Sequence, residues 1–362
     1  MGKERINIAI VGWGNVGKGV YRSIDNFSWL SSWSRNNDMN VAAIGTRRPE
    51  KVTREIERLI NLDNFQSDQA PAPRAPLVFH PDNIKQLEVL ERAIDVAILC
   101  GGSKNDLPRQ GPELVRYFNT VDSFDTHADI PEYFIRMNSH ANGFGHVAVI
   151  SAGWDPGTFS LERVLGDAFI PGTVPHGFYG LTKRGGLSMG HSDAARQVKG
   201  VKDARSYTHA IPKTIRRARE GATTIEPREM HRREVYVVLE KGVDEEKVRQ
   251  EIVNMPNYFA PYKTVVKFIS EEEMKRKHSK MPHNGVVIVS GKTGQGANNS
   301  ALIEYRNQWE SNPEATGNIL VACARAAYRL KKDGKTGAFT MLNIPPAYYS
   351  IHSREELLKD FM

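Results

Sequence analysis

Apolar runs alternate with polar, helix-like segments over about the first 150 residues of the chain. The first run, residues 6–11, is continuously apolar, which is typical of a strand buried on both faces of a parallel sheet. This alternation, with a glycine-rich first turn, predicts a Rossmann-type doubly wound α/β domain. Further strands of that domain are predicted at 39–48, 75–80, 94–102, 118–124 and 145–153.

The pattern changes in the second part of the chain, where strand-like runs follow one another with fewer long helices between them. This indicates an α+β domain with a mixed sheet, which we place at 155–311. Its strands are predicted within 176–181, 204–210, 233–240, 263–270 and 284–292.

The C-terminal part of the chain is expected to return to the first domain. A strong helix is predicted from Asn312, which can cap it, and Pro313 fits its first turn. We therefore assign 1–154 to the dinucleotide-binding domain and expect about 312–345 to complete that domain.

Two further stretches of the first domain are expected to lack regular structure. Residues 26–38 are expected to be an insertion, and the Pro- and Ala-rich residues 63–76 an exposed loop.

Composition limits the class of protein. The chain has 362 residues, 40% of them hydrophobic and 25% charged, which is enough for two globular domains. It lacks a long apolar run and a basic-then-apolar leader, so we expect a cytoplasmic protein without a membrane partner. Cys100 and Cys323 both lie in apolar stretches and are expected to be buried thiols without a catalytic role.

The net charge of +7 raises the question of a nucleic-acid partner. The basic clusters are interleaved with acids, however, and none alternates with aromatic residues as a nucleic-acid platform would. An anionic small molecule is therefore the favoured partner.

Three glycines, Gly12, Gly14 and Gly17, follow the first strand and open a helix-like segment. In a dinucleotide-binding turn, the first glycine makes the turn, the second admits a pyrophosphate and the third allows close packing of helix on strand. The intervening Asn15 and Val16 would then lie at the helix N-terminus, where backbone N–H groups favour an anion. The alternative is that these glycines are purely structural.

The second predicted strand ends in Thr46, Arg47 and Arg48, where an NAD-binding protein would place an acid for the ribose hydroxyl. Two guanidinium groups suit a 2′-phosphate, so we expect NADP as the cofactor; the alternative is a solvated strand end. Gly101 and Ser103, at the end of the fourth predicted strand, are expected to contact the cofactor as well.

Acidic side chains follow two later strands. Asp122 lies near the end of one predicted strand and Asp125 and Asp129 come after it, while Trp154 and Asp155 come after the next strand. Because ligands of open α/β sheets lie beyond the carboxyl ends of the strands, these carboxylates with an aromatic wall are suited to an ammonium group. Helix capping is the alternative for Asp155, which directly precedes a proline.

The second domain contributes donors suited to a carboxylate, namely Thr208, Arg233, His283 and Asn298. A lone histidine such as His191 is more often structural than catalytic. No Cys/His spacing indicates zinc, and no phosphate-binding loop of the nucleotidase type is present in the sequence.

Seven stretches, in this order, resemble the meso-diaminopimelate dehydrogenase family: VGWGNVGKGV, VDSFDTHADIP, VISAGWDPGTFSLERV, LSMGHSDAAR, NMPNYF, KMPHNGVVIVSG and KTGAFTML. The resemblance covers about residues 6–345. It implies a homodimer of lysine biosynthesis, with 155–311 as the substrate-binding and dimerisation domain. The enzyme would use NADP to deaminate the D-centre of meso-2,6-diaminopimelate oxidatively. The products would be L-2-amino-6-oxopimelate, ammonia and NADPH.

The resemblance also implies roles for individual residues. Asp125 and Asp155 would hold the reacting ammonium, with support from Asp129. Other expected substrate contacts are Trp154, Tyr179, Met189, Gly190, Thr208, Arg233, His283 and Asn298.

The sequence departs from the family pattern at three places. Tyr179 stands where tryptophan is common, Met189 stands where glutamine is common, and residues 181–184 are extra. Two alternatives therefore stay open: a dehydrogenase of another D-amino or diamino acid, and a catalytically silent NADP-binding protein.

Overall fold

The computed structural model of the chain describes residues 5–24, 36–64 and 75–362. Most of the expected insertion at 26–38 and loop at 63–76 lies outside these described residues. The chain divides into two compact units, Met1–Thr158 with Pro313–Met362, and Phe159–Asn312. Within the described part of the chain, no helix is long and apolar enough to cross a membrane.

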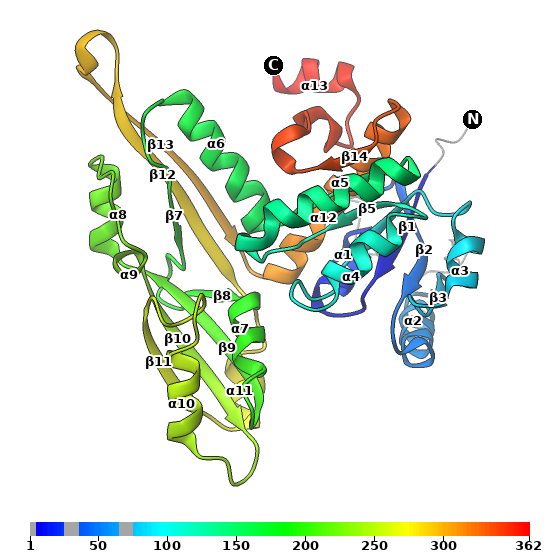
Figure 1. Ribbon diagram of the computed structural model, residues 1–362, viewed down its shortest axis with the longest axis horizontal. Helices are drawn as coiled ribbons and strands as arrows, with labels where there is room; N and C mark the ends of the chain where they lie inside the picture. Colours follow the sequence, from blue (N-terminus) through cyan, green and yellow to red (C-terminus); the bar gives the residue numbers. More distant parts are fainter. Residues whose placement is uncertain (1–4, 25–35, 65–74) are drawn as a thin grey trace. The chain divides into compact units, whose positions relative to one another are not determined.

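The first unit is built around a parallel sheet, to which the described residues contribute seven strands in the order β14-β6-β5-β4-β1-β2-β3 (Figure 1). All of its neighbouring strands pair in parallel. This confirms the predicted Rossmann-type sheet. Its strands are β1 (Ile6–Val11), β2 (Met39–Gly45), β3 (Leu77–Phe79), β4 (Val96–Leu99), β5 (Asn119–Asp122), β6 (Val147–Val149) and β14 (Gly337–Phe339).

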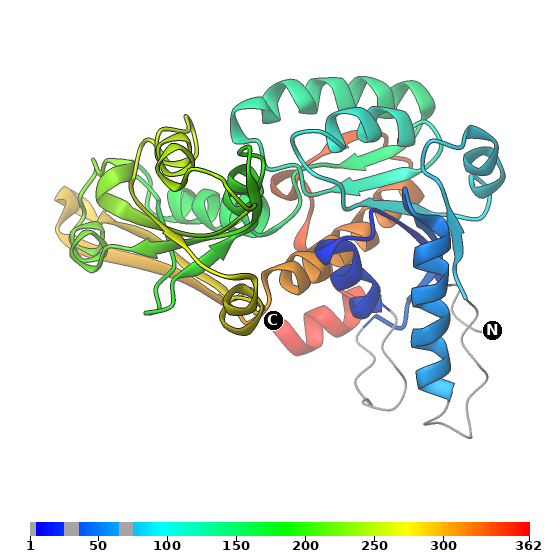
Figure 2. The same cartoon turned by 90° about the horizontal axis from the view of Figure 1, so that it is seen from below.

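Helices cover both faces of this sheet, as the continuous apolar pattern of its strands requires. Ile8 and Ile10 of β1 pack with one group of helices, whereas Ala9 and Val11 pack with the other. Figure 2 shows α4 and α5 on the opposite side of the sheet from α1 and α12. The first group is α1 (Asn15–Ile24), α2 (Pro49–Asn64) and α12 (Asn312–Lys332), and the second is α3 (Ile84–Leu90), α4 (Leu107–Leu114) and α5 (Ile130–Phe144).

The C-terminal segment is tied to the first unit by Arg325 of α12, whose side chain is only 3% exposed. Its guanidinium donates to both carboxylate oxygens of Asp38, at 2.6 and 2.8 Å, just before β2 begins. It also donates to Asn36 Oδ1 at 2.9 Å and to the carbonyl of Tyr349 at 2.8 Å. One side chain thus links three segments that are far apart in the sequence.

The second unit contains two sheets in its described residues, with strand orders β11-β10-β9-β8 and β13-β12-β7. The first is mixed, because β10 and β11 are parallel and its other pairs are antiparallel, as predicted. Figure 1 shows β12 and β13 as a long hairpin. Its strands are β7 (His176–Tyr179), β8 (Gly186–Ser188), β9 (Val201–Ala210), β10 (His231–Leu239), β11 (Lys263–Phe268), β12 (His283–Thr293) and β13 (Asn299–Trp309).

Helices cover these sheets too. Ala195 of α7 and Val248 of α10 join a buried cluster with Val235 and Val237 of β10. The helices of this unit are α6 (Phe159–Phe169), α7 (Met189–Arg196), α8 (Pro212–Arg219), α9 (Pro227–Met230), α10 (Glu245–Val253) and α11 (Glu271–Lys277).

Both cysteines are free thiols, as the sequence predicted, but only Cys323 is buried, whereas Cys100 is half-buried. Burial raises the pKa of Cys100 and of Cys323 to about 12, so neither forms a reactive thiolate at neutral pH.

Candidate active site

The glycine-rich turn between β1 and α1 leaves space beside only one of its three glycines. Gly12 has φ of 106°, and a Cβ there would come within 3.0 Å of the Cys100 carbonyl. A Cβ on Gly17 would lie 1.9 Å from the carbonyl oxygen of Gly12. A Cβ on Gly14, in contrast, would meet no described atom within 4 Å. Gly12 and Gly17 are therefore needed by the fold itself, whereas Gly14 leaves room for a ligand beside the N-terminus of α1, which Asn15 opens.

The end of β2 carries two exposed guanidinium groups. Thr46 is buried, and its Oγ1 accepts the backbone N–H of Arg48 at 3.2 Å. Arg47 lies 3.6 Å from Asp106 in an ion pair, and its side chain is 70% exposed. β2 is the parallel neighbour of β1, so these groups extend from the same sheet edge as the glycine turn. Their charge and position fit a 2′-phosphate. Val16 and Gly17 follow Asn15 in the first turn of the helix that would face the pyrophosphate.

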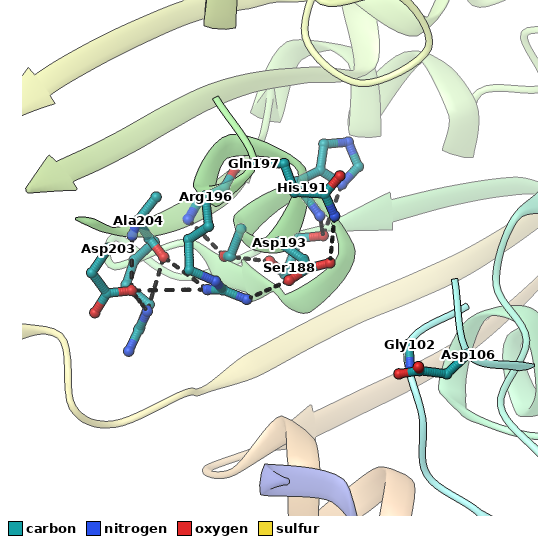
Figure 3. A network of polar contacts seen from close by, with 12 residues as sticks. Gly102, Asp106, Ser188, His191, Asp193, Arg196, Gln197, Asp203 and Ala204 are labelled. Carbon is teal, nitrogen blue, oxygen red and sulfur yellow. Dashed lines mark hydrogen bonds and ion pairs between the residues drawn. The ribbon is translucent and has the colours of Figure 1, made fainter. Parts of the chain in front are cut away.

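The loop after β4 is packed against the start of α4. The backbone N–H of Gly102 donates to Asp106 Oδ2 at 3.0 Å (Figure 3), and a Cβ on Gly101 would lie 2.7 Å from the Cβ of Asp106. Ser103 Oγ accepts the N–H of Asp125 at 3.0 Å and donates to a carbonyl of that same loop. Ser103 therefore joins the loop of an expected cofactor contact to the loop that carries a candidate catalytic acid.

The candidate acids extend from neighbouring parallel strands, β5 and β6. Asp125 and Asp129 are exposed in the segment after β5, and Trp154 is buried in the segment after β6. Asp155 has extended backbone angles, φ −149° and ψ 108°, and α6 begins four residues later at Phe159. Asp155 is therefore not the N-cap of α6, and the capping alternative is wrong.

In the second unit, Arg233 and Thr208 lie opposite each other on β10 and β9. They are 6% and 1% exposed, and Arg233 Nη1 donates to Thr208 Oγ1. The guanidinium lies 4.3 Å from the ring centroid of Tyr262. Burial lowers the pKa of Arg233 from its ordinary value, but a guanidinium stays cationic at neutral pH.

Arg233 lacks a complete set of partners. Its Nε has no hydrogen-bond partner, and no described carboxylate forms an ion pair with it. A buried cation without a counter-charge is costly, so this position is suited to a carboxylate supplied by a ligand.

Aromatic and imidazole rings surround this cation. His231 Nε2 accepts the backbone N–H of Tyr179 at 2.9 Å, and the Tyr179 ring centroid lies 6.3 Å from that of His283. Arg163 donates to the Tyr179 hydroxyl at 2.6 Å. Burial, with the charges of Arg233 and His283, lowers the pKa of His231 to about 3, so this ring is neutral at physiological pH. The sequence named His231 among the polar strand-end residues of this domain but favoured a solvated strand edge for the HRREV stretch. The structure instead buries His231, which is 4% exposed.

Asn298 does not join this group. In the β12–β13 hairpin, His283 pairs with Trp309, whereas Thr293 pairs with Asn299 at the other end. Asn298 lies exposed in the turn between these strands, ten ladder positions or roughly 30 Å from His283. The expected placement of Asn298 beside the distal donors is therefore wrong, because the hairpin register carries it to the opposite end.

Another amide, Asn312, lies near the His283 end of the hairpin. It is 6% exposed and follows Trp309, the partner of His283, by three positions. Its backbone N–H donates to Met281 at 2.7 Å, and its Nδ2 donates to the Leu187 carbonyl at 3.1 Å. From the sequence we expected Asn312 only to cap a helix, since its spatial neighbours come from segments far away in the chain.

No group of three or more metal-ligating His, Cys, Asp or Glu side chains is present in the described residues.

Residues 153–311 match the family model of the diaminopimelic acid dehydrogenase C-terminal domain. The chain is 45% identical to the meso-diaminopimelate D-dehydrogenase of Ureibacillus thermosphaericus. The matched region covers 99% of this chain and 100% of that protein. The chain belongs to the meso-diaminopimelate D-dehydrogenase family.

Solved structures agree with the family resemblance noted in the sequence. The DAP dehydrogenase of C. glutamicum in complex with DAP is 33% identical, covers 99% of both chains and has a TM-score of 0.83. An engineered D-amino acid dehydrogenase bound to NADP+ is 32% identical, covers 99% of this chain and 100% of the other, and has a TM-score of 0.82. Membership of the meso-diaminopimelate D-dehydrogenase family and its fold are thereby confirmed.

The departure that we expected at Met189 lies at the start of α7. Met189 and Gly190 are half-buried there, directly after Ser188, which caps the helix. Ser188 Oγ lies 2.9 Å from His191 Nδ1 (Figure 3). His191 thus supports the helix start from which Met189 extends, in line with the structural role expected of it.

Residues 181–184, which the resemblance led us to expect as an insertion, lie in a turn. The N–H of Gly185 donates to the Thr182 carbonyl at 2.9 Å, and Thr182 Oγ1 donates back to the Gly185 carbonyl at 3.3 Å. Lys183 and Arg184 are exposed at its tip. This turn lies between β7 and β8 and is tied to β12, because the N–H of Leu181 donates to Asn284 Oδ1 at 2.5 Å.

Proposed function

We propose that the chain is an NADP-dependent dehydrogenase that deaminates meso-2,6-diaminopimelate oxidatively at its D-configured carbon. The products are L-2-amino-6-oxopimelate, ammonia and NADPH, and the reaction is reversible. The observation that carries this proposal is the buried Arg233, which lacks a carboxylate counter-charge in the described residues. An amino acid with a distal carboxylate supplies that charge.

NADP fits the residues of the first unit. The space beside Gly14 would admit the pyrophosphate at the N-terminus of α1, and Arg47 and Arg48 would bind the 2′-phosphate. Gly101 and Ser103 would line the cofactor on the neighbouring strand end. When bound, NADP supplies the hydride acceptor, while the protein supplies orientation and charge.

The two ends of the substrate have separate roles. Asp125 and Asp155 would hold the reacting ammonium and accept its proton, against the wall formed by Trp154. Arg233 and Thr208 would bind the distal carboxylate.

Other contacts would complete the distal site. His283 and Tyr179 would line it, Asn312 would take the place expected of Asn298, and Met189 with Gly190 would contact the substrate at the start of α7. With the distal groups held, only one α-carbon can face the nicotinamide, which selects the D-centre.

We further propose that the enzyme is a cytoplasmic homodimer of lysine biosynthesis, which rests on the family resemblance. Light scattering of the purified protein tests the dimer. A mass near twice 40.6 kDa supports it, and a monomer contradicts it.

A second candidate is a dehydrogenase of another D-amino or diamino acid, favoured by Met189 and by the turn at 181–184. The decisive experiment follows NADPH absorbance with meso-, LL- and DD-diaminopimelate and a panel of D-amino acids, each with NADP and with NAD. Turnover of the meso isomer with NADP supports the first candidate. Preference for another D-amino acid supports the second, and NADP binding without turnover contradicts both.

A further inference from the structure

Asp122, the last residue of β5, is a fully buried carboxylate with a 0% exposed side chain. Its Oδ1 accepts the backbone N–H groups of Phe124 and Ser151, each at 3.0 Å. Its Oδ2 accepts the hydroxyl of Tyr133 in α5 at 2.8 Å. One carboxylate therefore binds donors from three separate segments of the first unit.

Two of these donors lie in the loops that carry the candidate catalytic acids. Phe124 directly precedes Asp125, and Ser151 begins the loop that leads to Asp155. Because the same oxygen accepts both N–H groups, the backbones of the two loops are held at one point. The carbonyl of Asp122 adds a further link by accepting the N–H of residue 152 at 2.8 Å.

The backbone of Ser151 adds a second observation. Its φ is 52°, in the left-handed region that residues other than glycine seldom adopt. Such a conformation persists only where its surroundings impose it, and such residues cluster at functional sites. Here the hydrogen bond to Asp122 holds the strained residue at the start of the loop.

The remaining donor comes from a rigid position. The Tyr133 ring stacks on Phe124, with centroids 4.3 Å apart, and a Cβ on Gly111 would come 2.3 Å from the Tyr133 hydroxyl. Burial, together with the nearby Asp122, raises the pKa of Tyr133, so its hydroxyl stays protonated and donates. Burial also raises the pKa of Asp122, while hydrogen bonds from Phe124, Ser151 and Tyr133 oppose that change.

We propose that Asp122 is a positioning residue for the reaction, which holds the loops of Asp125 and Asp155 in the relative placement that the reacting ammonium requires. This proposal rests on the proposed function of those two acids. A buried carboxylate is costly to keep in a fold, so packing alone does not account for it. Three donors from separate segments make this position suited to setting loop geometry.

The test compares Asp122→Ala, Asp122→Asn and Tyr133→Phe with the wild-type enzyme. Displacing reacting groups by about 1 Å costs on the order of 100-fold in rate. We therefore expect Asp122→Ala to lower kcat, calculated per NADPH-binding site, by about 100-fold. Asp122→Asn keeps an oxygen that accepts both N–H groups, so it should restore kcat to within about tenfold of wild type. Tyr133→Phe removes only one donor and should cost about threefold.

Asp95→Asn is the matched control, because Asp95 Oδ2 accepts the N–H of Asn7 at 2.8 Å at the amino end of the sheet. Its kcat should stay within about twofold of wild type. Counting sites by NADPH binding separates lost activity from lost folding. A kcat per site for Asp122→Ala within threefold of wild type would overturn the proposal.

Amide hydrogen exchange gives a readout that does not depend on the substrate. In Asp122→Ala, exchange should rise at 123–126 and at 151–155 while other peptides of the sheet keep their wild-type rates. If the wild-type enzyme turns over no diaminopimelate, the proposed function fails, and exchange alone decides whether Asp122 holds the two loops. Unchanged exchange in both segments overturns the positioning role.

Discussion

The backbone N–H of Tyr179 donates to His231 Nε2 over 2.9 Å, and this bond joins the two sheets of the second unit. Tyr179 ends β7 in the three-stranded sheet, and His231 begins β10 in the four-stranded sheet. Since Nε2 accepts, the neutral ring has its proton on Nδ1. Protonation of Nε2 would break this contact beside Arg233, which explains why a neutral ring is required here.

The lowered pKa of His231 predicts a pH-dependent stability. Its pKa falls from the ordinary 6.5 to about 3 on folding, so between these values the unfolded chain binds the additional proton. Stability from this group is therefore complete above the ordinary pKa and is lost as pH falls toward 3. As the pH is lowered from 6.5 toward 3, we expect the free energy of unfolding of the wild-type protein to fall more steeply than that of His231→Gln. The difference should be about 1.4 kcal/mol per pH unit.

Urea unfolding at a series of pH values measures this difference. The control is His352→Gln, since the His352 side chain is 45% exposed, and it should follow the wild-type slope. Equal slopes for the wild type and His231→Gln would contradict the neutral, buried state of this histidine.

Two glycines of the first turn should respond differently to alanine. Gly17→Ala places a Cβ 1.9 Å from the Gly12 carbonyl oxygen, so it should lower the free energy of unfolding by about 3 kcal/mol or more. Gly14→Ala meets no described atom within 4 Å and should change that free energy by less than about 1 kcal/mol. It should nevertheless raise the Kd for NADPH at least about tenfold, because its methyl group occupies the cofactor's space. Fluorescence titration measures the Kd for NADPH, and urea unfolding measures the free energy of unfolding. NADPH binding by Gly14→Ala with a wild-type Kd would mean that the pyrophosphate does not lie beside Gly14.

The guanidinium pair at the end of β2 predicts cofactor preference. Replacing Arg47 and Arg48 with alanine should raise the Kd for NADP by about 10- to 100-fold and that for NAD by less than about threefold. Arg54→Ala, which alters an exposed arginine that donates to a carbonyl of its own helix at 3.2 Å, is the control and should leave both constants near wild type. Equal weakening of NADP and NAD binding would reject the 2′-phosphate assignment.

Asp155→Asn tests the proposal that Asp155 holds the reacting ammonium. We expect kcat to fall by about 100- to 10,000-fold while the Kd for NADPH stays within about twofold, since only the ammonium loses its partner. Asp167→Asn changes an exposed carboxylate on α6 and should keep wild-type turnover. Stopped-flow measurement of NADPH formation gives both values, and an unimpaired Asp155→Asn would remove this residue from the mechanism.

The bond between Arg325 and Asp38 predicts a stability effect in the first unit. Arg325→Met leaves a carboxylate that is only 14% exposed without its partner, which should cost about 3–5 kcal/mol in urea unfolding. The exposed pair of Arg22 and Glu314 also joins α1 to α12, but Arg22→Met should cost less than about 1 kcal/mol. Similar losses in both variants would mean that the buried pair is not what secures α12.

Much of the fold was predictable because local patterns determine it. Continuous apolar runs predicted β1 and β4 of the first sheet, and the longer strands β9 and β10 carry enough residues for a clear pattern. β14 was missed because Gly337–Phe339 lacks the continuous apolar run that marked β6, the strand with which it pairs. β13 was missed because its alternating exposed positions resemble a polar segment until β12 pairs with it.

The candidate site divides in the same way. The glycine turn, the arginines at the end of β2 and the acids after β5 and β6 could be located from the sequence, since each directly follows a strand. The choice between Asn298 and Asn312, the contact of His231 with Tyr179 and the link through Asp122 came only from the tertiary structure. Those relationships depend on hairpin register and on contacts between residues far apart in the chain, which no local periodicity encodes.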